Sequence, residues 1–318
     1  MTTVNPIEPS DTLAQPASSI AAAGAATTWT KQKYRTGQSM TPGQKMLTYA
    51  VLVLGAVLFM IPFYFIVNGS LKTQADVEAG NFVSLPHSWS DIQWHNYPRS
   101  LAPDKMDFWP ALANTIVITT LCVFGQIISC SLVGFGFARF QFRGRSILFM
   151  LMLSTMMLPT QVTMIPVFIL FRYLHMIDTF WPLIIPSWLA SPFFVFMFRQ
   201  FFSQIPEDLI EAARMDGASN WRIYWQLMLP LSGPVIAIVA IYTFMGTWND
   251  FLNPLIYLNS PTKRTIALAL NAFKGQYGFT DAQLMMAASV VCLLPCVILF
   301  FACQKYFVDS IAMTGLKG

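Results

Sequence analysis

Long apolar stretches alternate with short polar ones along most of the chain. Six of the apolar stretches are each long enough to cross a bilayer as a helix, since about 20 apolar residues span roughly 30 Å of hydrocarbon. The six stretches lie at residues 46–67, 110–138, 146–171, 179–202, 231–258 and 282–307. The pattern therefore predicts an all-α integral membrane protein with six transmembrane helices.

The composition supports this fold class. Of the 318 residues, 55% are hydrophobic and only 11% are charged, and the mean hydropathy is +0.53. A soluble domain needs about a quarter of its residues charged to cover its surface, so a soluble enzyme is excluded. The net charge of +4 is too small to indicate a nucleic-acid partner.

The basic residues indicate the orientation of the chain. If the N-terminus is inside, 12 of the 19 Lys and Arg residues fall in cytoplasmic segments and 7 fall in outer segments. Loops rich in Lys and Arg normally stay in the cytoplasm. We therefore expect both termini to be cytoplasmic.

Two polar segments flank the first apolar stretch. Residues 1–40 are rich in Ala, Thr, Ser and Pro, which predicts a disordered cytoplasmic extension before a membrane domain at 41–318. A cleaved signal peptide is the alternative, but the segment lacks the basic start and the apolar core of such a peptide. Residues 68–108 are long enough to form a small external cap.

Prolines interrupt the third and fourth apolar stretches. They are Pro159 and Pro166 in the third, and Pro182, Pro186 and Pro192 in the fourth. A backbone group freed by proline inside a bilayer needs a partner from a neighbouring helix or a water-lined cavity, so we expect both spans to face protein. The pattern fits static kinks and helices that bend during transport equally well.

A hydrophilic segment, residues 204–228, separates the fourth and fifth stretches. Pro206 and the acidic residues after it indicate the start of a helix. Gly217 indicates a turn, and Ser219 can begin a second short helix that runs toward Pro230. Such a hairpin is compatible with an amphipathic element on the lipid headgroups and with a knob that fits a protein socket.

The same segment resembles the EAA loop of bacterial ABC importer permeases. The matching residues are Glu211, Ala212, Ala213, Asp216, Gly217, Ala218, Trp221 and Pro230. From about residue 47 to 318 the chain is similar to the carbohydrate branch of that superfamily, and specifically to maltose-permease MalG-like subunits. Further similarities are Ala138-Arg139-Phe140 after the second stretch and Trp248-Asn249-Asp250-Phe251 in the fifth.

The resemblance implies a type I ABC importer permease fold with a cytoplasmic coupling helix between spans four and five. In this family the EAA segment docks in a cleft of a cytoplasmic ATPase, where Glu211 would make polar contacts and Gly217 would allow the turn. ATP and Mg²⁺ would be bound by that ATPase, because this sequence has no G-x-x-x-x-G-K-[ST] loop. We expect no catalytic, cofactor or metal site in this chain.

The resemblance also implies a set of partners in a bacterial or archaeal plasma membrane. They are a second, MalF-like permease, an ABC ATPase dimer, an extracytoplasmic solute-binding protein and a sugar substrate. A homodimer of this chain is the alternative to the pair of different permeases.

Asp250 is the acidic residue that falls well inside a predicted span, where an ionisable group is costly unless it is paired or hydrated. Sugar hydroxyls need hydrogen bonds and a sugar ring face stacks on aromatic side chains. We therefore expect a substrate pathway at Trp248, Asn249, Asp250 and Asn253. Asp250 could equally bond a neighbouring helix, and the polar Gln161 and Asn114 are weaker pathway candidates for the same reason.

Two other classes of membrane protein fit the sequence less well. An ion- or proton-coupled secondary transporter, the main alternative, should carry several ionisable groups within its spans and inverted repeats. A membrane enzyme should show clustered His, Cys or carboxylates. The three histidines lack ligand spacing, and the five cysteines in apolar stretches indicate no disulfide framework.

Overall fold

The computed structural model describes residues 41–315 except 82, 85–87 and 274–280. The described residues are helical throughout, with short connections and no strand. The predicted N-terminal extension lies outside the described residues. The chain divides into two compact units, Met1–Leu58 and Phe59–Gly318. α1 (Pro42–Ser70) begins in the first unit, and all later helices belong to the second.

The described part of the chain has up to six candidate membrane spans. Four are long, apolar helical segments: α1 (Pro42–Ser70), α4 (Phe108–Arg139), Trp181–Gln204 and the first part of α15 (Ala282–Gly315). The segment Trp181–Gln204 consists of α7 (Trp181–Trp188) and α8 (Pro192–Gln204). Two further pairs of helices qualify if each bent pair is counted as one span. The predicted fold class is confirmed.

The third predicted span is broken. α5 (Arg145–Ser154) continues into η2 (Thr155–Met157), and α6 (Thr160–Tyr173) then departs at 99°. Pro159 precedes α6 with an extended backbone, which explains the break. Pro159 and Pro166 are exposed in the isolated chain, whereas Pro182 in α7 is buried, so the expectation that both spans face protein is met within this chain at Pro182 and stays a prediction for the third span.

The fifth predicted span is interrupted as well. α12 (Gly233–Trp248) ends before Asn249, and the chain becomes helical again as α13 (Leu252–Tyr257). The apolar stretch predicted as a span over residues 231–258 therefore contains two helices, and only α12 has the length of most of a span. The carboxylate of Asp250 accepts the backbone N–H of Asn253 at 3.2 Å, so it satisfies a donor at the start of α13 and stabilises the break.

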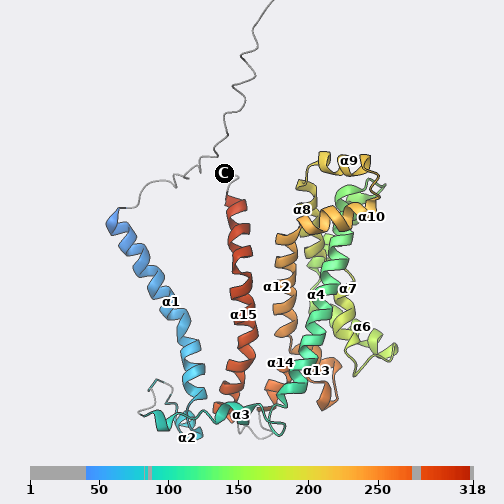
Figure 1. Ribbon diagram of the computed structural model, residues 1–318. Coiled ribbons are helices and arrows are strands. Elements are labelled where there is room, and N and C mark those ends of the chain that lie inside the picture. The colour runs from blue at the N-terminus through green and yellow to red at the C-terminus, as the bar shows by residue number, and fades with distance from the viewer. Residues whose placement is uncertain (1–40, 82, 85–87, 274–280, 316–318) are drawn as a thin grey trace, which may run out of the picture. The chain divides into compact units, whose positions relative to one another are not determined.

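α4 lies at the centre of the second unit and packs against α7, α8 and α12 (Figure 1). Glycines on α4 allow the close approach. A Cβ atom on Gly134 would lie 2.7 Å from Cβ of Phe198 in α8, and one on Gly125 would lie 2.4 Å from the ring of Trp188 in α7. Small residues at helix interfaces are typical of membrane proteins, in which van der Waals packing drives helix association.

The segment between α1 and α4 contains three short helices: α2 (Gln74–Glu78), η1 (Trp89–Asp91) and α3 (Asn96–Ser100). The side chain of Asn96 donates to the carbonyls of Ser70 and Lys72, both at 2.9 Å. An ion pair of 2.6 Å between Lys105 and Asp281 joins this segment to the start of α15. At the same end of the unit lie α13, η4 (Pro261–Lys263), α14 (Ile266–Leu270) and η5 (Asn271–Phe273) (Figure 1).

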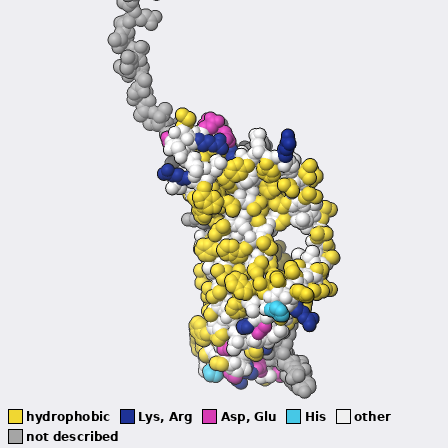
Figure 2. All heavy atoms as spheres, turned by 90° about the vertical axis from the view of Figure 1, so that its right-hand side faces the viewer, with side chains coloured by type: hydrophobic (Ala, Val, Ile, Leu, Met, Phe, Trp, Pro, Cys, Tyr) yellow, Lys and Arg dark blue, Asp and Glu magenta, His cyan; other side chains and the backbone are white. Residues whose placement is uncertain are grey.

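Hydrophobic side chains cover the middle of the face drawn in Figure 2, and charged side chains gather toward its two ends. Many large apolar residues of α5, α6 and α15 are exposed in the isolated chain. An exposed apolar band with polar ends is the surface that a bilayer or another membrane protein covers.

Candidate functional site

The segment between α8 and α12 forms a helical hairpin, here called the EAA hairpin (residues 206–231). It consists of α9 (Glu207–Met215), α10 (Asn220–Ile223), the π-helical η3 (Tyr224–Met228) and α11 (Leu229–Leu231). Gly217 turns the chain with φ +77°, and the side chain of Ser219 accepts the N–H of Arg222 at 3.3 Å. The predicted helix start, turn and second helix are confirmed.

Arg139, the last residue of α4, fastens the start of the hairpin. Its guanidinium donates to the carbonyl oxygens of Phe202 and Ile205, and it lies 2.6 Å from Oε2 of Glu207. The Arg139 side chain is only 9% exposed. A planar guanidinium can serve several acceptors with fixed geometry, so this one side chain ties α4, the end of α8 and the first turn of α9 together.

Tyr224 fastens the other arm. Its hydroxyl lies 2.7 Å from the hydroxyl of Ser131 on α4, and its ring packs 5.4 Å from that of Phe135. Tyr224 and Phe135 belong to the largest buried apolar cluster among the described residues, which also includes Phe198, Phe202, Ile210, Ile223 and Met228. Both arms of the hairpin are therefore packed on α4 and α8.

The remaining face of the hairpin points away from this cluster. Ala213 and Ala218 pack against the cluster, whereas Glu211, Ala212, Asp216, Gly217, Trp221 and Pro230 are exposed. Large apolar side chains are part of this exposed face, among them Met215, which is 88% exposed, and Trp221. Exposed apolar side chains beside carboxylates are typical of a protein interface.

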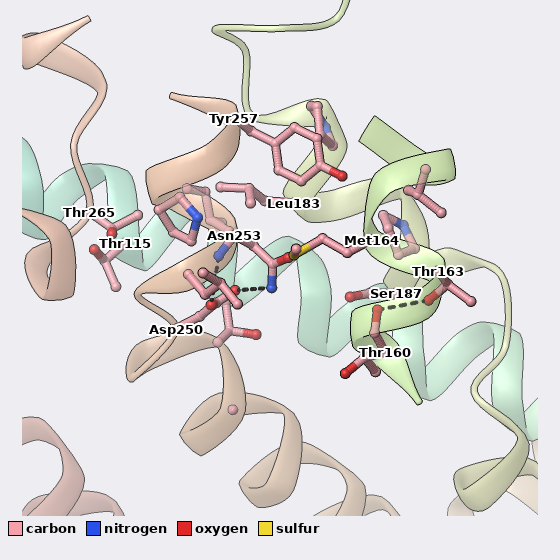
Figure 3. Close-up of a pocket in the computed structure, with 18 of the residues that line it drawn as sticks. Thr115, Thr160, Thr163, Met164, Leu183, Ser187, Asp250, Asn253, Tyr257 and Thr265 are labelled. Atoms are coloured by element: carbon pink, nitrogen blue, oxygen red, sulfur yellow. Dashed lines mark hydrogen bonds between the residues drawn. The ribbon is translucent and has the colours of Figure 1, made fainter. Parts of the chain in front are cut away.

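A cavity of about 460 Å³ lies near the breaks of the third and fifth spans. Its walls come from α4, α6, α7, α12 and α13. Figure 3 shows Asp250 and Asn253 on the α13 side of the cavity, with Thr160, Thr163 and Met164 of α6 across from them. Non-helical backbone at membrane depth is tolerated where it is buried in protein or lines a cavity.

The structure brings some of the expected pathway residues to this cavity. Asp250, Asn253 and Gln161 line it, and the Asn253 amide donates to Asp250 at 2.8 Å. Asn249 lies outside the lining and donates to the carbonyl of Met245. Asn114 is also outside the lining and joins α4 to the carbonyls of Thr262 and Arg264.

Trp248 is directed away from the cavity. Its indole N–H donates to the carbonyl of Cys292 on α15 at 3.2 Å, and its ring stacks on Phe244. It is buried in a separate apolar cluster. The structure therefore does not place Trp248 beside Asp250 as an aromatic wall; the ring that lines the cavity belongs to Tyr257.

The loop between α6 and α7 is clamped to the segment after α13 by Asp178. Its carboxylate accepts the backbone N–H groups of Asn259 and Ser260, both at 2.9 Å, and the Ser260 hydroxyl at 2.5 Å. Lys263 lies 3.1 Å away. The hydrogen bond from the Ser260 side chain, followed by those from the two backbone groups, holds the pKa of Asp178 well below its usual range.

The sequence analysis named Arg139 as part of a family resemblance but missed its contact with the hairpin, and it missed Ser131 and Tyr224 there and Thr160, Ser187 and Tyr257 at the cavity. Pro159 before Thr160 was an available signal, since an extended proline often precedes a helix start that exposes polar residues. The partners of Arg139 and Tyr224 are 63 or more residues away along the chain, and no local pattern reveals them.

The chain is a bundle of broken apolar helices, and it carries an EAA hairpin whose exposed face points away from the bundle. This combination defines a permease subunit of an ABC importer. The chain belongs to the family described as "Binding-protein-dependent transport system inner membrane component", whose model matches residues 131–313. This membership favours an importer permease over an ion- or proton-coupled secondary transporter.

Curated relatives cover most of the chain. The arabinooligosaccharides transport system permease protein AraQ of Bacillus subtilis is 32% identical over 264 residues, which is 83% of this chain and 92% of AraQ. The sn-glycerol-3-phosphate transport system permease protein UgpE of Yersinia enterocolitica is 29% identical over 272 residues, which is 85% of this chain and 96% of UgpE.

The fold matches a solved importer. A chain of a bacterial ABC transporter involved in the import of the acidic polysaccharide alginate superposes with a TM-score of 0.74 at 24% identity. The match covers 85% of this chain and 99% of the other. A chain of the alginate transporter in complex with an alginate pentasaccharide-bound periplasmic protein gives a TM-score of 0.58 at 15% identity. These similarities establish the fold.

Proposed function

We propose that this chain forms half of the translocation pathway of an ATP-driven importer for a carbohydrate, and that the EAA hairpin couples it to a separate ATPase. The observation that carries the proposal is the hairpin itself, which Arg139 and Tyr224 hold on α4 while Glu211, Met215 and Trp221 face outward. When the ATPase surface that holds the hairpin moves, the hairpin moves with it. The helices packed against the hairpin then move as well, because packed interfaces shift as units.

The partners follow from this role. An ABC ATPase dimer binds ATP and Mg²⁺ and receives the outward face of the hairpin. A second, MalF-like permease completes the pathway, and an extracytoplasmic binding protein delivers the substrate. The complex lies in a bacterial or archaeal plasma membrane, with both termini of this chain and the EAA hairpin on the cytoplasmic side.

A carbohydrate is the substrate class that the available observations support best. AraQ, a relative that shares 32% identity, is named for arabinooligosaccharide transport. The cavity carries hydroxyl, amide and carboxylate side chains around the ring of Tyr257, and such side chains bind sugar hydroxyls while an aromatic ring supports the apolar sugar face. Of the four residues expected on the substrate pathway from the sequence, this proposal keeps Asp250 and Asn253.

Reconstitution tests the proposal. The complete complex in proteoliposomes, supplied with its binding protein, should take up arabinotriose only when ATP is present inside. Glu211→Gln should lower uptake and substrate-stimulated ATP hydrolysis by at least about tenfold, which corresponds to about 1.4 kcal/mol. Glu78→Gln, on α2 away from the hairpin, is the matched control. Full coupled activity of the Glu211→Gln complex would contradict the proposed role of the hairpin.

A further inference from the structure

The side chains that line the cavity include a negative charge but no positive charge among the described residues. Asp250 is the one charged residue among the described lining residues, and no Lys, Arg or His stands there. Its two oxygens accept from the backbone and side chain of Asn253, which are neutral donors. The negative charge of Asp250 therefore has no cation facing it within the described lining of this chain.

Neutral polar groups make up the rest of the polar wall. Thr160, Gln161 and Ser187 come from α6 and α7, and Thr247 comes from α12. The hydroxyl of Thr265 has no hydrogen-bond partner among the described residues although the side chain is buried. A buried hydroxyl without a partner is costly.

One aromatic ring complements these groups. Tyr257 lines the cavity and is held in place by Phe168 and Phe171, whose ring centroids lie 5.9 Å and 5.8 Å from its own. Figure 3 shows Tyr257 at one end of the cavity, and Asn253 and then Asp250 further along it. An apolar sugar face could rest on the ring while neighbouring hydroxyls reach the polar wall.

We propose that this cavity is a subsite for an uncharged saccharide and that Asp250 disfavours substrates bearing phosphate or carboxylate groups. A carboxylate accepts hydrogen bonds from sugar hydroxyls, which are neutral donors. The same carboxylate repels a second anion, and in a partly desolvated cavity this repulsion is screened less than in bulk water. The inference rests on the proposed function, because it assumes that the cavity lies on the substrate pathway.

Direct binding to the intact complex in nanodiscs, without the binding protein, tests the selectivity of the pathway itself. The probes are arabinotriose, galactotriose and trigalacturonate, the last two differing by three carboxylates, and saturation-transfer difference NMR measures binding. At least one neutral trisaccharide should bind, and trigalacturonate should bind at least about tenfold more weakly. Equal binding of trigalacturonate, or binding of no neutral trisaccharide, would overturn the proposal.

Substitutions assign the selectivity to this cavity. Asp250→Asn should reduce the preference for galactotriose over trigalacturonate by about tenfold, and Asp104→Asn, an exposed carboxylate outside the cavity, should leave it unchanged. Gln161→Lys should strengthen trigalacturonate binding, whereas Asn259→Lys, outside the lining, should not. If Asp250→Asn and Gln161→Lys both keep the wild-type preference for galactotriose over trigalacturonate, the selectivity arises outside this cavity. That result would overturn the proposed role of Asp250.

The two proposals fail in different ways. If ATP-driven uptake requires Glu211 but the anionic and neutral probes bind alike, only the selectivity inference is wrong. If uptake is independent of ATP or of Glu211, the proposed function is wrong whatever the cavity binds.

Discussion

The guanidinium of Arg139 lies 2.6 Å from the carboxylate of Glu207, which joins the last residue of α4 to the first residue of α9. The same guanidinium donates to two carbonyls where α8 ends. The central helix of the bundle and the hairpin therefore share one buried cation. Movement of the hairpin should reach α4 through this contact and through the packing of Tyr224.

Replacing Arg139 should weaken this connection. In Arg139→Lys a single ammonium group cannot donate to all the acceptors that the planar guanidinium serves. We therefore expect the free energy of unfolding to fall by about 1–3 kcal/mol. We also expect fewer substrate molecules transported per ATP hydrolysed. Both are measured on the reconstituted complex, by thermal unfolding and by parallel uptake and ATPase assays. Glu207→Gln should cost less than about 1 kcal/mol, because that carboxylate is half exposed. An unchanged transport ratio in Arg139→Lys would argue against a connecting role.

The α4–α8 interface allows a matched glycine test on one helix. Gly134→Ala places a Cβ atom 2.7 Å from Phe198, and overpacking of this kind costs about 1–3 kcal/mol. Gly136→Ala meets nothing within 4 Å and should leave the thermal midpoint of the purified chain unchanged or slightly raised. Equal midpoints for the two variants would show that α4 and α8 do not approach so closely in solution.

The turn of the EAA hairpin offers a second glycine pair. Gly217 and Gly80 both have positive φ, +77° and +73°, and a Cβ atom on either meets nothing within 4 Å. Alanine at either position should cost about 1 kcal/mol through the backbone alone. We expect Gly217→Ala to lower ATP-coupled uptake well beyond Gly80→Ala, because only the former distorts the coupling surface. Similar uptake in Gly217→Ala and Gly80→Ala would show that the turn at Gly217 has no particular role in coupling.

The Asp178 clamp should depend on pH in one direction. Since hydrogen bonds lower the pKa of Asp178 in the folded chain, the stabilisation is complete above the ordinary carboxyl pKa of about 4 and is lost as pH falls below it. The thermal midpoints of wild type and Asp178→Asn should differ by a constant amount from about pH 8 to about pH 5 and converge below about pH 4. Asp104→Asn is the control. If the thermal midpoints of wild type and Asp178→Asn move further apart as the pH falls, the pKa of Asp178 is not lowered in the folded chain.

The sequence was sufficient for the positions of the candidate spans and for the hairpin, because both depend on local signals, but not for the breaks within the third and fifth spans. Span length follows from bilayer thickness, and the hairpin follows from Pro206, Gly217 and Ser219, each of which favours its observed conformation locally. The break after α12 was missed because the segments on either side of it, residues 233–247 and 254–258, are apolar and together reach the length of a span. Asp250, three residues before Asn253, is a capping pattern that could have indicated it.

The candidate site was harder to predict because tertiary packing decides which side chains meet. Trp248 is two residues from Asp250 in the chain, yet it packs against α15 and leaves the cavity to Tyr257. Arg139 and Glu207 are 68 residues apart, and one sequence without relatives gives no sign of their contact. Helical periodicity gives the face of a residue but not its neighbour on another helix.

Site-specific cross-linking tests the central claim most directly. In inside-out membrane vesicles, a short bismaleimide should join a cysteine at Met215, on the exposed face of the hairpin, to a cysteine introduced on the partner ATPase. The cysteine at Met215 should stay unlabelled by a membrane-impermeant thiol reagent added to intact cells. Trp89→Cys, in the segment between α2 and α3, which lie at the opposite end of the unit from α9 (Figure 1), should show the reverse. Labelling of Met215→Cys from outside intact cells, without a cross-link to the ATPase, would contradict the account.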